Sequence, residues 1–155
     1  MKIMYAIYSF FLIMATAMIT KYFVDMGLIP FYDMLEKPFL TPPKHYFSII
    51  WGILYVLMFV GFYIALIEPK TYTQSLDLHL LFVQQLFLQI LWTFCFFYMH
   101  QLCISVFIIV LLGIVTAFLM HTLFFIDLWA FILFIPYLLW LLFATYLNVF
   151  IVLLN

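Results

Sequence analysis

Residues 102–126 read LCISVFIIVLLGIVTAFLMHTLFFI, and residues 128–154 read LWAFILFIPYLLWLLFATYLNVFIVLL. Only Asp127 separates these two runs. About 20 apolar residues in an α-helix cross the roughly 30 Å hydrocarbon core of a bilayer. Each run is therefore long enough to cross a membrane, and we predict spans at about 102–126 and 128–154.

Three further apolar segments precede these runs, at about 3–19, 46–67 and 80–99. Charged residues bound the segments, because a charged side chain is costly in hydrocarbon. The apolar runs are continuous, whereas barrel strands alternate apolar and polar residues over about ten positions. A helix also satisfies its own backbone hydrogen bonds inside the bilayer. We therefore predict an all-α membrane protein, a bundle of five transmembrane helices.

The first segment has a second interpretation. Lys2, the apolar run after it and Ala15-Thr16-Ala17 also fit a secretory signal with its cleavage site. The apolar run continues past that site to Ile19, and this favours a first span that is retained.

The composition excludes several function classes. Hydrophobic residues make up 71% of the chain and charged residues 7%, against about 45–50% and about 25% in soluble domains. With five Lys, no Arg and a net charge of -1, no basic patch is available for nucleic acid. Cys95 and Cys103 form no disulfide or zinc pattern, and the histidines are too scattered to predict a metal site. We expect one domain over residues 1–155.

The loop at 20–45 differs from the rest of the chain. It holds most of the charge and four of the six prolines, including Pro42 and Pro43. Because proline removes a backbone donor and restricts its neighbours, we predict an ordered, turn-rich cap over a cavity instead of a span.

Polar and aromatic residues recur at helical spacing within three predicted spans, and small residues form pairs four positions apart. Two interpretations stay open: these residues hold the helices together, or they converge on an aromatic cavity for a flat apolar ligand with a polar edge. The small pairs are Ser48/Gly52, Gly61/Ala65 and Gly113/Ala117. The candidate cavity residues are Trp51, Tyr55, Gln89, Trp92, Tyr137, Trp140, Ala144 and Asn148.

Several of these residues lie in longer motifs. Residues 31–43 read FYDMLEKPFLTPP, residues 51–58 read WGILYVLM and residues 136–148 read PYLLWLLFATYLN. Together with Gln85-Leu86, Trp92 and Phe96-Phe97, they resemble the TspO/MBR family, also called translocator proteins, tryptophan-rich sensory proteins or peripheral benzodiazepine receptors. In that family the loop reads aromatic-Tyr-x-x-Leu-x-Lys-Pro-x-Trp-x-Pro-Pro, and Trp-x-x-Leu-Tyr-x-x-Met follows. The resemblance covers essentially the whole chain.

The resemblance implies a five-helix bundle, commonly dimeric, whose first loop closes over a ligand cavity. Such proteins bind protoporphyrin IX, haem-related tetrapyrroles, sterols and drug-like molecules, and some promote light-dependent porphyrin breakdown through cavity tryptophans. Carried over by motif, the cavity residues are Trp51, Tyr55, Trp92, Trp140, Ala144 and Asn148, with Pro42 and Pro43 in the lid.

This sequence departs from the family pattern at several positions. Leu40 stands in place of a tryptophan in the loop, Gln89 in place of an asparagine, and Thr93 in place of a proline that follows Trp92. We expect a smaller pocket beside Gln89 and a straighter third span. No Lys or Arg follows Tyr146, which argues against sterol binding through a C-terminal motif.

Three functions follow from these features. The leading hypothesis is a membrane receptor or carrier, with no required cofactor, in which Trp51 and Trp140 stack against a porphyrin while Gln89 and Asn148 meet its polar edge. The second is an enzyme that degrades protoporphyrin under light through Trp51 and Trp140. The third is a structural or regulatory membrane partner without a small ligand. The short chain without a basic tail favours a bacterial envelope membrane.

Overall fold

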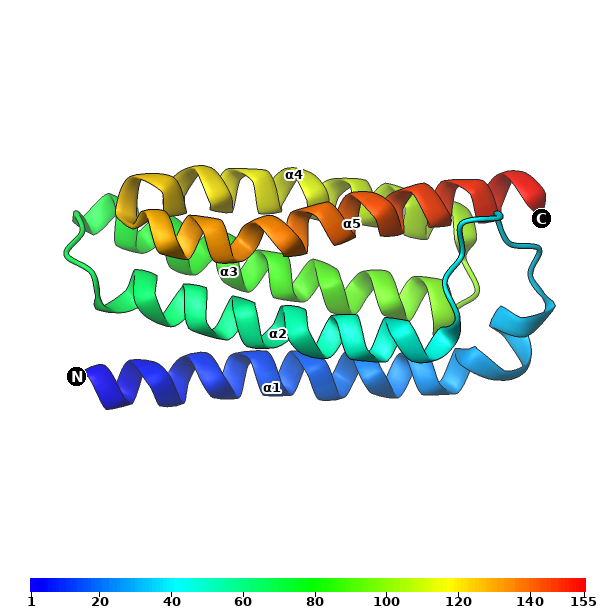
Figure 1. Cartoon of the computed structure of the whole chain (residues 1–155), viewed down its shortest axis with the longest axis horizontal. Helices are drawn as coiled ribbons and strands as arrows, with labels where there is room; N and C mark the ends of the chain where they lie inside the picture. Colours follow the sequence, from blue (N-terminus) through cyan, green and yellow to red (C-terminus); the bar gives the residue numbers. More distant parts are fainter.

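The computed structural model describes residues 1–155, apart from the side chain of Pro30, and shows a bundle of long helices (Figure 1). The π-helical turn η1 follows α1 and is kinked at Ile29, and the π-helical turn η2 continues α3. The elements are α1 (Lys2–Gly27), η1 (Leu28–Tyr32), α2 (Lys44–Ile67), α3 (Tyr72–Thr93), η2 (Phe94–Tyr98), α4 (Leu102–Ile126) and α5 (Leu128–Leu154).

The five helices close into a ring. α1 packs against α2 and α3, α3 against α4, α4 against α5, and α5 against α2. The helices run along the long axis of the molecule, and the segment between α1 and α2 lies at the same end as the C-terminus (Figure 1). We call residues 28–43 the lid segment and this end the lid end.

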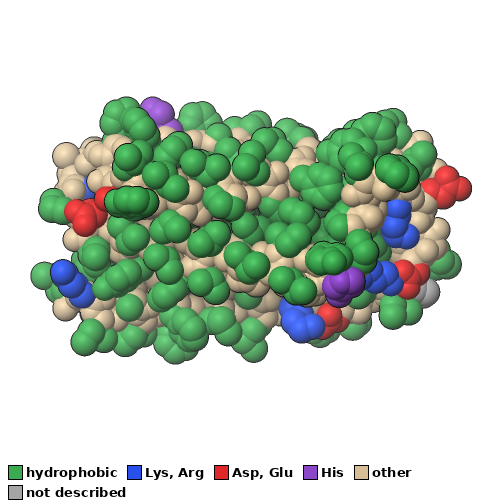
Figure 2. Space-filling view, viewed as in Figure 1, with side chains coloured by type: hydrophobic (Ala, Val, Ile, Leu, Met, Phe, Trp, Pro, Cys, Tyr) green, Lys and Arg blue, Asp and Glu red, His purple; other side chains and the backbone are tan. Residues whose placement is uncertain are grey.

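The outer surface suits a bilayer. All five helices are long and apolar enough to cross a membrane, and large side chains such as Phe107 and Phe118 are 71% and 63% exposed. Figure 2 shows hydrophobic side chains over the middle of one face, with the charged side chains toward the two ends. Because exposed apolar area of this extent is stable only against lipid, the protein is a multi-pass integral membrane protein.

The observed helices confirm the predicted five-helix bundle and correct two of its boundaries. α4 and α5 match the predicted spans, and α2 begins only two residues early. Residues 20–27, predicted as loop, continue α1, and α3 begins at Tyr72 instead of Leu80. Charges mark where hydrocarbon ends, but a helix of 26 residues is about 39 Å long and extends beyond a 30 Å core.

Local signals explain where two helices begin. Thr71 caps α3 by accepting a hydrogen bond from the Gln74 backbone N–H at 3.2 Å, and the Gln74 side chain accepts one from the Thr71 backbone N–H at 2.9 Å. The Asp127 carboxylate caps α5 by accepting a hydrogen bond from the Ala130 backbone N–H at 2.8 Å. Such caps satisfy the free N–H groups of a first turn.

Only one of the three small-residue pairs supports a helix contact. A Cβ atom added at Gly61 would lie 3.0 Å from the Phe134 ring, so Gly61 lets α2 approach α5 closely. Gly52 and Gly113 have no other atoms within 4 Å of an added Cβ. Their neighbourhoods are open, and Gly52 borders the cavity described below.

The lid segment is packed against the turn between η2 and α4. The Phe31 ring stacks on the His100 ring with 3.9 Å between centroids. Tyr32 is buried, and its ring lies 5.9 Å from the Phe97 ring. The lid segment therefore packs onto the bundle through its aromatic side chains, and its role as a lid over a ligand stays a prediction.

Candidate ligand-binding cavity

A cavity of about 420 Å³ lies inside the lid end of the ring. α1, α2, α3 and α5 supply its walls, and residues of the two π-helical turns complete the lining. α4 contributes no lining residue. The lining includes Thr20, Tyr32, Phe47, Trp51, Tyr55, Gln89, Trp92, Phe96, Ala144 and Asn148.

Several aromatic rings line the cavity, and they pack together around Trp51. The Trp51 ring lies 5.9 Å from Tyr55, 6.3 Å from Trp92 and 6.3 Å from Tyr137, measured between centroids. These spacings fall within the range of favourable aromatic contacts. The rings of Trp51, Tyr55 and Trp92 therefore give the cavity an apolar, aromatic surface built from α2 and α3.

Two hydrogen bonds hold the deeper part of the cavity. The Tyr137 hydroxyl, which is fully buried, donates to the Gln89 side-chain oxygen at 3.1 Å. The Tyr55 hydroxyl and the Thr20 hydroxyl share a hydrogen bond of 2.9 Å. These contacts join α3 to α5 and α2 to α1, so the polar groups of the cavity also fix the positions of its walls.

A second polar network joins α3, α5 and α4 beside the cavity. The Trp92 indole N–H donates to the Asn148 side-chain oxygen at 2.9 Å, and the Asn148 amide N–H donates to the Ser105 hydroxyl at 3.0 Å. Ser105 itself donates to the Leu102 carbonyl at 2.6 Å. The network holds the Trp92 ring in one orientation and satisfies its only polar atom.

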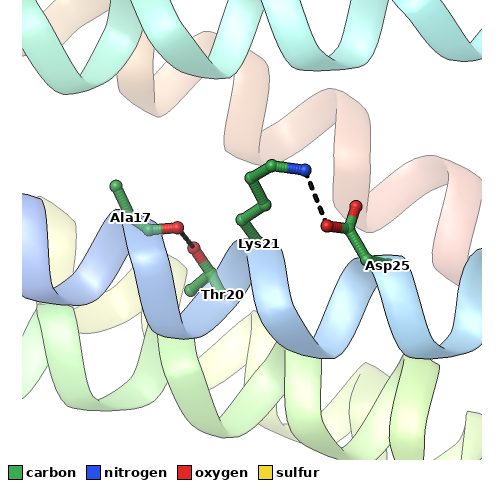
Figure 3. A network of polar contacts seen from close by, with 4 residues as sticks. All are labelled: Ala17, Thr20, Lys21 and Asp25. Carbon is green, nitrogen blue, oxygen red and sulfur yellow. Dashed lines mark hydrogen bonds and ion pairs between the residues drawn. The ribbon is translucent and has the colours of Figure 1, made fainter.

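The cavity opens between α1 and α2. Lys21 and Asp25 on α1, and Ser48 and Gly52 on α2, line the cavity and are exposed. Lys21 donates to the Asp25 carboxylate at 2.6 Å, and both side chains extend from the same face of α1 (Figure 3). Lys44, which also lines this part of the cavity, forms an ion pair with Asp33 of the lid segment.

The sequence comparison agrees with this architecture. The sequence model described as the TspO/MBR family matches residues 9–154. The chain belongs to the TspO/MBR family. This assignment confirms the resemblance found in the loop and span motifs.

Two relatives show how far the likeness extends. A protein named tryptophan-rich sensory protein, from Cereibacter sphaeroides, is 35% identical over 76% of this chain and 72% of its own length. A protein named tryptophan-rich protein TspO, from Archaeoglobus fulgidus, is 30% identical over 100% of this chain and 99% of its own length. This TspO/MBR chain is therefore similar to the second relative from end to end.

The predicted site residues of this TspO/MBR protein fall into two groups. Most of them line the cavity: Trp51, Tyr55, Gln89, Trp92, Ala144 and Asn148. Tyr137 lies behind the lining and reaches it through Gln89 and Trp51. Trp140 lies outside the lining and packs edge-on against Phe47 with 5.6 Å between centroids. Their roles in ligand binding stay predictions.

The lid contributes to the cavity through other residues than the predicted prolines. Pro43 is the N-cap of α2, and neither Pro42 nor Pro43 borders the cavity. Leu28 and Tyr32 of the lid segment, and Lys44 directly after it, do border the cavity. Pro42 and Pro43 therefore lead the chain into α2, and Tyr32 and Lys44 form part of the cavity surface.

Several residues of the cavity and of the network beside it were not predicted from the sequence. Thr20 was assigned to the loop. Phe47, which lines the cavity, and Ser105, which bonds Asn148 beside it, resemble many other residues of the same kind in the chain. The one available signal was the position of Ser105, a hydroxyl within an otherwise apolar run at 102–112, since polar groups in a span usually face another helix.

Proposed function

We propose that this protein is a membrane receptor or carrier that binds a porphyrin, such as protoporphyrin IX or a haem-related tetrapyrrole, in the cavity at the lid end. The observation that carries the proposal is the cavity itself, which is walled by Trp51, Tyr55 and Trp92 and has a buried amide at Gln89. Apolar walls with a few converging polar groups are typical of small-molecule sites. The sensory name of one relative supports a role in signalling, and a bacterial envelope membrane is the proposed location.

The walls suit a planar macrocycle. A porphyrin lying against Trp51 gains the burial of its apolar face and about 0.5–1.5 kcal/mol for each well-placed aromatic contact. Tyr55 and Gln89 lie beside that face and offer polar contacts to the pyrrole edge. Asn148 already bonds Trp92 and Ser105, so its proposed role is to hold the Trp92 ring in place.

The test is a titration of purified protein with protoporphyrin IX in the dark, followed by the porphyrin absorption band. We expect saturable binding at one site per chain. Trp51→Leu should weaken it about threefold to tenfold, because it removes one aromatic contact. Trp129→Leu is the matched control, because Trp129 is 68% exposed at the start of α5, away from the cavity. Absorption that rises linearly without saturation would contradict the proposal and favour a structural or regulatory protein.

Illumination separates a binding protein from a porphyrin-degrading enzyme. After the dark titration, the bound sample is exposed to light and the porphyrin is extracted. A receptor or carrier returns the original porphyrin spectrum, and an enzyme returns a changed one that depends on Trp51. The dimer implied by the family stays a prediction, which cross-linking in the same detergent can test.

A further inference from the structure

The helix boundaries move a charged pair from the predicted loop into the first helix. Lys21 and Asp25 belong to α1, which continues to Gly27. Lys21 lies six residues before the end of α1, about 9 Å along its axis. The adjacent residue, Thr20, bonds Tyr55 within the bundle. Lys21 therefore leaves α1 next to a residue that packs inside the bundle, at the border of the cavity.

The Lys21 side chain points to the cavity mouth instead of into a closed protein interior. Its charged end bonds Asp25, one turn closer to the lid end, and its side chain is 74% exposed (Figure 3). Both residues line the opening between α1 and α2. Long lysine chains commonly cover apolar surface with their stems while the ammonium reaches water.

A second lysine borders the same cavity from the other side of the opening. Lys44 is the first residue of α2, and its side chain is 38% exposed. It stands seven residues before Trp51, which places the two residues on nearly the same face of α2, about two turns apart. The cavity thus has an aromatic wall at Trp51 and one lysine on each of two helices at its border, Lys21 on α1 and Lys44 on α2.

Both cations are held by weak, exchangeable partners. Lys21 pairs with Asp25 and Lys44 with Asp33, and all four side chains are substantially exposed. Exposed ion pairs contribute little to stability, about 0–1 kcal/mol each. A ligand carboxylate can therefore replace an aspartate on either lysine with little cost to the fold.

We propose that Lys21 and Lys44 bind the two carboxylates of a planar, dianionic ligand whose apolar face rests on Trp51. The inference depends on the proposed function and makes it more specific: the ligand class is an amphipathic tetrapyrrole with acid groups on one edge. That edge lies at the opening between α1 and α2. When the cavity holds no ligand, Asp25 and Asp33 form the ion pairs with the two lysines in place of the ligand carboxylates.

Lys37, the remaining lysine at the lid end, has other partners. Lys37 donates to the Leu35 carbonyl at 2.8 Å and lies over the Tyr32 ring. Its side chain therefore stabilises the lid segment and is not part of the cavity lining. The Asp25 carboxylate also borders the cavity mouth and repels an anionic ligand. This repulsion is offset when the Lys21 ammonium lies between the Asp25 carboxylate and the ligand carboxylate and contacts both.

The experiment compares protoporphyrin IX with its dimethyl ester, which keeps the macrocycle and loses both charges. Affinities are measured in a neutral detergent, in which no anionic lipid competes, for wild type, Lys21→Gln, Lys44→Gln and the double variant. Lys2→Gln is the matched control, since it removes the same charge at the opposite end of α1. Thermal unfolding of each variant checks that the fold is intact.

We expect each cavity variant to bind the diacid about fivefold more weakly and the double variant about twentyfold more weakly, as for exchangeable charge pairs near water. The ester should bind all variants alike, and Lys2→Gln should match wild type. Asp25→Asn should strengthen diacid binding, because it releases Lys21. Salt should weaken binding of the diacid and not of the ester.

The outcomes separate this inference from the proposed function. If diacid and ester bind wild type equally, or if the lysine variants weaken both to the same degree, the carboxylate role of Lys21 and Lys44 is wrong while porphyrin binding stands. If neither compound binds saturably, the proposed function itself is wrong.

Discussion

The Asn155 carboxamide bonds both backbone groups of Glu36. The Glu36 N–H donates to the Asn155 side-chain oxygen at 2.9 Å, and the Asn155 amide donates to the Glu36 carbonyl at 2.9 Å. The same amide donates to the Ile151 carbonyl at 2.9 Å. One side chain therefore ties the middle of the lid segment to the end of α5, across 119 residues of sequence.

Removing this link should loosen the lid. Asn155→Ala deletes both hydrogen bonds to Glu36, and two exposed bonds of this kind contribute about 1 kcal/mol in total. We expect faster amide hydrogen exchange over residues 33–43 and little change in the core of α4. Leu154→Ala, which alters an exposed neighbour without a bond to the lid, is the control. Equal exchange in both variants would show that other contacts hold the lid.

A pair of glycine substitutions should have opposite effects. A Cβ atom at Gly27 would lie 2.6 Å from the Phe97 carbonyl carbon, so Gly27→Ala forces α1 away from η2. Overpacking of this kind costs about 1–3 kcal/mol. Gly52→Ala meets open space and gains up to about 1 kcal/mol of helix propensity. Thermal unfolding in detergent should place Gly27→Ala below wild type and Gly52→Ala at or above it.

The network around Asn148 should contribute measurably to stability. Asn148→Leu leaves the Trp92 indole N–H without its acceptor and removes the amide donor to Ser105. We expect the free energy of unfolding to fall by about 1 kcal/mol, a typical magnitude for hydrogen bonds between membrane helices. Thr145→Ala, which loses only a bond within α5 to Leu141, is the control. An equal loss of stability in both variants would argue against the network.

The lid should make stability sensitive to high pH. Burial first, and the Asp33 charge second, raise the pKa of Tyr32 to about 12 from its ordinary value of 10.0. The folded protein therefore retains the phenol proton of Tyr32 to a higher pH than the unfolded chain does. The contribution of the protonated phenol to the free energy of unfolding is present below about pH 10 and is lost as pH rises toward 12. The unfolding temperature should fall less steeply between pH 10 and 12 in Tyr32→Phe than in wild type, and parallel curves would contradict this assignment.

The spans themselves could be predicted from the sequence because the signal is local. An uninterrupted apolar run such as 102–126 must lie in hydrocarbon, and a helix is the structure that satisfies its backbone there. Asp127 both ends one helix and caps the next, so that boundary was predicted correctly. The predicted end of α1 and the predicted start of α3 were wrong, because charged residues indicate where a chain leaves the hydrocarbon core and the helix continues beyond that point.

The candidate site was predictable only in part. Motif and helical spacing selected Trp51 and Trp92, which meet in the cavity, but they also selected Trp140, which packs outside it against Phe47. Spacing along one helix says which residues share a face, and it does not say which neighbour that face meets. The role of Lys21 depends on the same missing information.

By itself, the sequence determined that this protein lies in a lipid bilayer, that it is all-α and that it has five spans. Each of these follows from the length and apolar character of its continuous segments. The tertiary structure alone decided the order of the helices in the ring, the bond from Asn155 to Glu36 and the opening between α1 and α2. These features depend on how each helix is rotated against its neighbours. That rotation is set by packing between residues far apart in the sequence, and no local pattern encodes it.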